Sequence, residues 1–237
     1  IGFFSKELPS DAPSGVSKQV HWLANSLCEK GHILTCYSFS PLPADARYGH
    51  VQLGGFAGSR PSRLFAPALR FRALQRRTHD VFHYHGDDYL CFSRRPRVRT
   101  FYGSALSEAR FAATRQRRCR QMLFYLFELI SCTHRGRKIG ISTATRRVLP
   151  GVDEVIPCGV PLESFARDTG VEKSEHPTLL FIGDFKSRKR GDFMLDVFER
   201  SVRPAFANAR LIIVGPRRVA APGVECLGRI SETDIDA

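Results

Sequence analysis

Apolar residues in the first part of the chain alternate between short continuous runs, typical of buried strands, and repeats of three to four positions, typical of helices. The run at 1–5 predicts a strand, the repeat from 16 to 27 predicts a helix that Gly31 ends, and 33–39 predicts the next strand. Strand, loop, helix and strand in this order form a βαβ unit, and such units build parallel sheets. The pattern therefore predicts an α/β fold.

The same alternation continues to residue 157. Further strands are expected at 81–85, 98–102, 138–142 and 155–157, and further helices at 62–77, 105–132 and 143–149. Ser142 is placed to cap the last of these helices.

The polar stretch 167–177 contains Gly170 and Pro177 and predicts a linker. After it the pattern restarts, with strands expected at 178–182, 209–214 and 224–227 and a helix at 191–202. We therefore expect two α/β domains, residues 1–168 and 169–237, of which the second is incomplete because a domain usually has about 100–150 residues.

The charge balance adds a preference for anionic partners, since 36 Lys and Arg against 23 Asp and Glu give a formal net charge of +13. The seven cysteines show no CxxC spacing, which disfavours a zinc ribbon or a thioredoxin site and favours a reducing, cytoplasmic compartment. No apolar run approaches the ~18 residues of a membrane-spanning helix, and Glu128 interrupts the longest one. No signal peptide is recognised.

Arginine is concentrated in two segments, one of which, 94–120, has nine Arg and only Glu108 as an acid. The arginines at 115–120 precede the apolar run 122–127. Such a segment can dock on an anionic membrane, although a core helix with a solvated basic face is the favoured interpretation. No helix-turn-helix, ribonucleoprotein or zinc-finger signature supports a specific nucleic-acid partner.

Two loops are candidate anion sites. Ser14-Gly15 precedes a helix, where glycine allows close approach and the helix dipole favours an anion, although a plain turn fits equally and no dinucleotide or P-loop fingerprint is present. The segment 186–191 carries Lys186, Arg188, Lys189 and Arg190 after a strand that ends at Gly183. Cations at the carboxyl edge of a parallel sheet suit a diphosphate, and a solvated charged loop is the alternative.

His83 and His85 alternate on one strand and should point to one face. With Asp87 they resemble a zinc motif, but that motif requires a His where Asp88 stands. We therefore expect no metal here, and a strand end whose loop lines the carboxyl edge of the sheet.

Seven ordered segments resemble the motifs of the family 4 retaining glycosyltransferases. They are SGVSKQV with KGH within 14–32, DVFHYHG at 80–86, RTFYGS at 99–104, ISTAT at 141–145, VIPCGVPLESF at 155–165, LFIG with ARLIIVG within 180–215, and VECLGRI at 224–230. The resemblance implies the GT-B arrangement, two Rossmann-like domains facing a cleft. It also implies transfer of a sugar from a nucleotide-sugar to a glycan or lipid-linked acceptor, with retention and without a metal or a further cofactor.

The resemblance assigns roles residue by residue. Lys189 matches the diphosphate lysine, and Gly15 matches the second glycine of the loop that approaches the phosphates. Asp184 stands where the family often has the diphosphate arginine, so Arg188 or Lys186 is expected to substitute.

Tyr102 stands where the family has a histidine that contacts the donor sugar, and is the expected catalytic residue. The remaining residues expected to line the cleft are Ser14, which replaces the first glycine of its loop, His85, Gly103 and Gly183. The donor is expected mainly on the second domain and the acceptor mainly on the first.

The acidic E(F)G…E segment of the family has no match in this sequence. We therefore expect a C-terminally truncated, inactive fragment of a cytoplasmic glycosyltransferase that is peripheral to the membrane. The alternative is a non-catalytic basic binding module for acidic lipid or nucleic acid.

Overall fold

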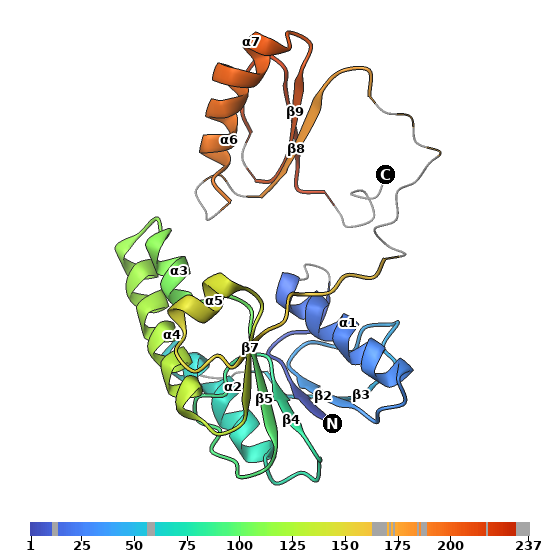
Figure 1. The fold of residues 1–237 in the computed structure, drawn as a ribbon, viewed down its shortest axis with the longest axis vertical. Helices are drawn as coiled ribbons and strands as arrows, with labels where there is room; N and C mark the ends of the chain where they lie inside the picture. The colour runs from blue at the N-terminus through green and yellow to red at the C-terminus, as the bar shows by residue number, and fades with distance from the viewer. Residues whose placement is uncertain are drawn as a thin grey trace. The chain divides into compact units, whose positions relative to one another are not determined.

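The computed structural model describes residues 1–10, 14–55, 60–162, 170, 172, 174–183, 185, 189–216 and 218–230 (Figure 1). The chain forms two compact units, residues 1–107 with 119–166 and residues 108–118 with 167–237. A boundary at 168/169 falls outside the described residues and stays a prediction.

The first unit is built on a seven-stranded parallel sheet in the order β3-β2-β1-β4-β5-β6-β7. The strands are β1 Gly2–Phe4, β2 Thr35–Ser38, β3 Gly49–Gln52, β4 Phe82–Tyr84, β5 Arg97–Phe101, β6 Arg137–Gly140 and β7 Glu154–Val155. The predicted parallel α/β sheet is confirmed. Its order reverses between β1 and β4, and open parallel sheets bind ligands at the carboxyl ends of strands beside such a reversal.

Helices cover the two faces of this sheet unequally (Figure 1). They are α1 Gly15–Glu29, α2 Arg60–Leu74, α3 Ala105–Arg110, α4 Arg115–Thr133 and α5 Thr143–Val148. α1 packs on the face that carries Phe3. On the other face, Phe71 of α2 packs with Phe4, and the end of α4 packs with Phe101. Right-handed crossovers explain this, because β1 to β2 runs toward one edge of the sheet and the later helical crossovers run toward the other.

Local sequence sets several helix ends, and those at Gly31 and Ser142 were predicted. The Ser14 hydroxyl accepts a hydrogen bond from the Ser17 N–H at 3.1 Å and caps α1. Gly31 follows that helix with a φ of 86°, which favours glycine. Ser142 caps α5 by accepting from the Thr145 N–H at 3.2 Å.

The single helix predicted over 105–132 is wrong, because the chain leaves α3 at Arg110 and starts α4 at Arg115. Thr114 accounts for the break. Its hydroxyl accepts a hydrogen bond from the Arg117 N–H at 3.2 Å, and its carbonyl accepts one from the Arg118 N–H, as at an N-cap. The edge strand β3 was not predicted.

The second unit has a three-stranded parallel sheet in the order β10-β9-β8, made by β8 Thr178–Ile182, β9 Arg210–Val214 and β10 Val224–Gly228. The predicted helix is α6 Gly191–Val197, which continues through the π-helical turn η2 Phe198–Val202 into α7 Arg203–Ala205. Phe198 packs against Leu211 and Ile213 in its core.

Candidate functional site

Tyr102 and His85 meet where β5 and β4 end. The Nδ1 atom of His85 lies 2.9 Å from the Tyr102 hydroxyl. Burial, His83 and Arg99 hold the pKa of His85 well below its usual value, so the imidazole is neutral. Burial also raises the pKa of Tyr102, so its hydroxyl stays protonated. The pair therefore offers a neutral hydroxyl held by a buried imidazole.

His83 lies on the same face as His85, as the alternation predicts, with stacked rings whose centroids are 4.1 Å apart. Its Nε2 atom is 2.8 Å from the Thr100 hydroxyl, and burial lowers its pKa to about 3. Within the described part of the chain, no group of three His, Cys, Asp or Glu is placed to hold a metal ion. Both imidazoles instead make hydrogen bonds across β4 and β5.

Glycines follow both members of the pair. Gly86 and Gly103 have φ values of 152° and 135°, a region that favours glycine. The chain therefore turns sharply directly after His85 and directly after Tyr102.

Glu128 of α4 holds the turn after Tyr102. Its carboxylate oxygens lie 3.1 and 3.0 Å from the Ala105 nitrogen, and Oε2 accepts a hydrogen bond from the Ser104 hydroxyl at 3.2 Å. Burial raises the pKa of Glu128, while the Ala105 N–H and Arg99 oppose that rise. In the sequence, Glu128 was visible only as an interruption of an apolar run.

Asp88 forms a second buried cluster, on the loop after β4. Its side chain is fully buried, pairs with Arg97, and lies 3.3 Å from the Nε of Arg99. The Ser131 hydroxyl of α4 donates to it at 2.7 Å. The cluster ties this loop to β5 and α4, and the sequence pattern did not reveal it.

Ser14 and Gly15 lie at the N-terminal end of α1. A Cβ atom at Gly15 would meet none of the described residues within 4 Å, so these residues leave the backbone open to an approaching ligand there. The Ser14 hydroxyl is engaged in capping the helix. These features are compatible with an anion at this end of α1.

A cavity of about 930 Å³ lies on the α1 face of the first sheet. Tyr102 and His83 line it together with Ile139, Ile141 and residues 156–162. At its wall the Gln19 amide donates to the Gly159 carbonyl at 2.8 Å. Of the expected site residues that the structure describes, only Tyr102 lines this cavity; Ser14, Gly15, His85, Gly103, Gly183 and Lys189 do not.

In the second unit, Lys189 lies across Gly183. Its ammonium donates to the Ile182 carbonyl at 3.1 Å, at the carboxyl end of β8. A Cβ atom at Gly183, whose φ is 153°, would lie 2.4 Å from the Lys189 side chain. Glycine at 183 therefore allows the lysine to reach the strand end. Lys186 and Arg188 lie outside the described residues.

Residues 13–164 match the family model described as Glycosyltransferase Family 4. The chain belongs to this family. The predicted family resemblance is thus confirmed, and no curated protein matches the chain.

Solved structures share the fold. WaaG, a glycosyltransferase involved in lipopolysaccharide biosynthesis, is similar with a TM-score of 0.67 and 14% identity over 99% of this chain and 71% of its own. Anabaena Alr3699/HepE, in complex with UDP and glucose, is similar with a TM-score of 0.65 and 12% identity, over 99% of this chain and 70% of its own. The lipopolysaccharide outer core galactosyltransferase WaaB has a TM-score of 0.57 and 13% identity, over 99% of this chain and 69% of its own. The fold is therefore of the GT-B type, as predicted.

Proposed function

We propose that the protein transfers a sugar from a nucleotide-sugar to a hydroxyl of a glycan or lipid-linked acceptor, with retention and without a metal ion. The family match over 13–164 carries this proposal, because the matched range contains Gly15, the His85–Tyr102 pair and Gly103. In the reaction the bond from the anomeric carbon to the diphosphate oxygen breaks. The acceptor oxygen bonds to the same face of that carbon, and its proton passes to the departing diphosphate.

Each proposed role rests on the geometry of one residue. The Tyr102 hydroxyl contacts the donor sugar, and His85 sets its orientation. The Lys189 ammonium, at the end of β8, stabilises charge on the diphosphate, with Arg188 or Lys186 as the second cation. Gly15 allows the backbone at the start of α1 to approach the phosphates.

The acceptor is proposed to enter the cavity of about 930 Å³, because Tyr102 lines it. The cavity is within the size range of small-molecule sites, and it combines the Tyr102 hydroxyl with apolar side chains such as Ile139 and Leu162. A glycan with an apolar carrier would match both kinds of lining.

Contact with an anionic membrane is a further part of the proposal. α4 exposes Met122, Leu126 and Ile130, four residues apart, by 41%, 55% and 41%. The arginines at 115–120 precede this stripe, a combination that suits a headgroup interface. Among the described residues, none of the helices has the length and hydropathy needed to cross a bilayer. All seven cysteines are unpaired, which supports the proposed cytoplasmic location.

The decisive experiment incubates the full-length protein with UDP- and GDP-sugars and a mixed acceptor pool, with and without EDTA. We expect transfer that EDTA does not abolish, with a product that has the anomeric configuration of the donor by NMR. The 237-residue chain alone should be inactive, because it has no match to the acidic donor-binding motif. Absence of transfer by the full-length protein, together with binding to anionic vesicles, would favour the basic binding module instead.

A further inference from the structure

A second cavity, of about 650 Å³, lies in the first unit beside the end of α2 and the loop that leads into β5. Arg72 and Arg76 line it from the helix end, and Phe92, Arg94 and Arg95 line it from the loop. The loop precedes the first residue of β5, whereas Tyr102 follows the last. This cavity is therefore at the opposite edge of the sheet from the candidate active site.

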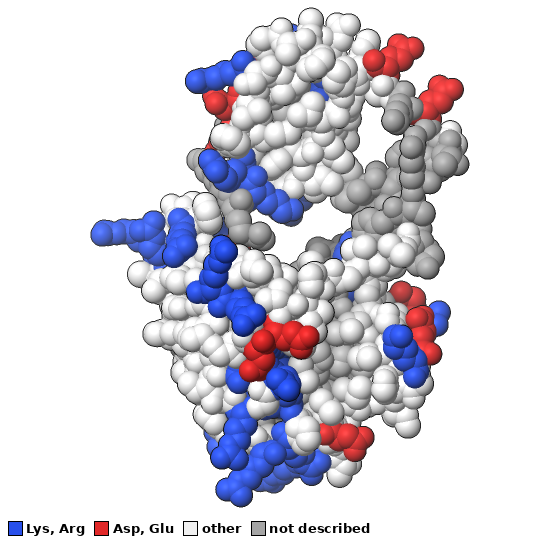
Figure 2. All heavy atoms as spheres, in the orientation of Figure 1, with Lys and Arg blue, Asp and Glu red and all other residues white. Residues whose placement is uncertain are grey.

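The arginines of this cavity have no acidic partner. No Asp or Glu lines the cavity, and none of the four arginines forms an ion pair with any residue that the structure describes. The next arginine along the chain, Arg97, is in contrast paired with the buried Asp88. Figure 2 shows Lys and Arg side chains gathered at the lower end of the first unit. An anion would relieve the mutual repulsion of these cations.

The helix dipole explains only part of this arrangement. Cations near a helix C-terminus are favoured, which accounts for Arg72 and Arg76. Arg94 and Arg95 come from a separate loop, in which the Arg95 N–H donates to the Ser93 hydroxyl at 3.1 Å. That turn puts two further arginines around the cavity. The dipole of α2 does not account for these two arginines, because they do not belong to the end of that helix.

We propose that this cavity binds a phosphate-bearing group, either a free phosphate or diphosphate, or the phosphate of an anionic lipid headgroup. The planar guanidinium group binds phosphate oxygens in bidentate fashion, and two pairs of arginines suit the charge of a diphosphate or of two phosphates. Phe92, 67% exposed, adds an apolar side chain at the same cavity, which a lipid interface would cover. This site is independent of the proposed sugar transfer.

The test compares the wild-type protein with two double variants that each lose two positive charges. Arg94→Ala/Arg95→Ala removes the loop arginines. Arg146→Ala/Arg147→Ala is the matched control, because both residues are exposed on α5 and have no ion pair among the described residues. All four side chains are exposed, so both variants should fold, which thermal unfolding verifies.

Two probes separate the sources of phosphate. In the first, inorganic pyrophosphate is titrated, and NMR follows the backbone amide signals of Phe92, Ser93 and Arg97, which the wild type and both double variants share. The second measures sedimentation with phosphatidylcholine vesicles that contain or lack phosphatidic acid. With at least one probe, the loop variant should bind roughly tenfold or more weakly than wild type, and the α5 variant should bind as wild type does.

A selective loss with pyrophosphate identifies a soluble phosphate ligand, and a selective loss with phosphatidic acid identifies a lipid headgroup. Either result supports the site. Equal effects of both double variants with both probes, or no binding of either probe by the wild type, would overturn it and leave the arginines as solvated surface charge.

Discussion

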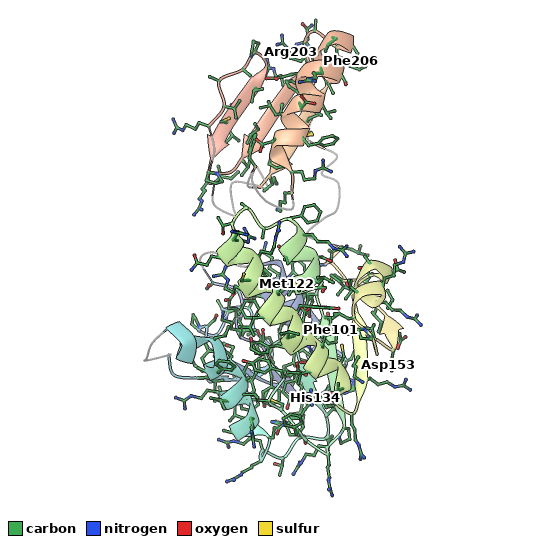
Figure 3. The ribbon with its side chains drawn as sticks, turned by 90° about the vertical axis from the view of Figure 1, so that its left-hand side faces the viewer. Phe101, Met122, His134, Asp153, Arg203 and Phe206 are labelled. Atoms are coloured by element: carbon green, nitrogen blue, oxygen red, sulfur yellow. The ribbon has the colours of Figure 1, made fainter. Side chains whose placement is uncertain are left out.

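The carboxylate of Glu128 accepts a hydrogen bond from the backbone N–H of Ala105, with its two oxygens 3.1 and 3.0 Å from the nitrogen. Ala105 follows Tyr102 by three residues, and the Tyr102 hydroxyl is bound to His85. α4, which carries Glu128, packs against Phe101 (Figure 3). His85 lies on the opposite face of the sheet, beside Phe3. The turn that carries Tyr102 is therefore held from both faces of the sheet.

Removing the Glu128 side chain should loosen this turn. Glu128→Ala leaves the Ala105 N–H and the Ser104 hydroxyl without their acceptor, so the free energy of unfolding should fall by about 1–3 kcal/mol and kcat by about tenfold. Glu128→Gln keeps an acceptor oxygen on a side chain of the same shape. It should therefore retain most of the free energy of unfolding and most of kcat. Urea unfolding and steady-state kinetics test this, with the exposed Glu154→Ala as the control. Wild-type behaviour of Glu128→Ala would contradict it.

The raised pKa of Glu128 gives a pH signature. The folded protein binds this proton more tightly than the unfolded chain, so ionisation of Glu128 opposes folding. The resulting stability is present below the unfolded value of 4.5 and is lost as pH rises through the higher folded pKa. As pH rises above the unfolded value of 4.5, Glu128→Gln should therefore gain stability relative to wild type. A difference that does not change with pH would argue against this.

Asp88 should matter more for stability than an exposed aspartate. Asp88→Ala leaves Arg97 buried without its ion-pair partner and removes one of the acids beside Arg99, which should lower the free energy of unfolding by about 3–5 kcal/mol. The control is Asp80→Ala, an exposed position where the change should stay within about 0.5 kcal/mol. Equal urea midpoints for the two variants would show that the cluster contributes nothing specific.

Tyr102→Phe should lower kcat by about tenfold, because the hydroxyl that His85 orients is lost. Tyr125→Phe is a matched control, since its hydroxyl donates to the Val148 carbonyl at 3.0 Å and Tyr125 does not line the cavity at Tyr102. Both variants lose one hydrogen bond, so their stabilities should change similarly and only kcat should differ. If the two have equal kcat, Tyr102 has no catalytic role.

Lys189→Ala should lower kcat/KM by about one to two decades, as expected for loss of a charge-assisted contact of about 1.5–3 kcal/mol. The effect should be similar for every nucleotide-sugar accepted, because all of them carry the diphosphate. Lys6→Ala, at an exposed loop position, should change the activation free energy that corresponds to kcat/KM by less than about 0.5 kcal/mol. Equal kcat/KM for the two variants would remove the proposed diphosphate role.

Cap chemistry is local, and this is why it could be predicted. Gly31 and Ser142 act on backbone groups within a few residues, so the sequence shows both partners at once. Thr114 uses the same chemistry, yet apolar spacing continues from Phe111 into α4 and suggested one helix. β3 was missed for a different reason, since this short edge strand is largely exposed and has no apolar run.

Long-range pairs could not be predicted in this way. Glu128 and Ala105 are 23 positions apart, and Asp88 and Ser131 are 43 apart. Neither spacing has a periodic signature, because these contacts depend on how α4 crosses the sheet. His85 and Tyr102 were both selected from motifs, but their hydrogen bond became evident only once β4 and β5 were paired.

The unequal covering of the first sheet bears on how this enzyme family can change its substrates. Among α1, α2 and α4, whose packing is described above, only α1 lies on the face of the sheet that carries Tyr102. The cause is the right-handedness of the crossover connections, which places the later helices on the other face. The space beside Tyr102 is thus a product of chirality and strand order rather than of any one side chain. Substitutions at Ile139 or Leu162 could reshape it freely during evolution, while the opening itself would persist as long as the strand order does.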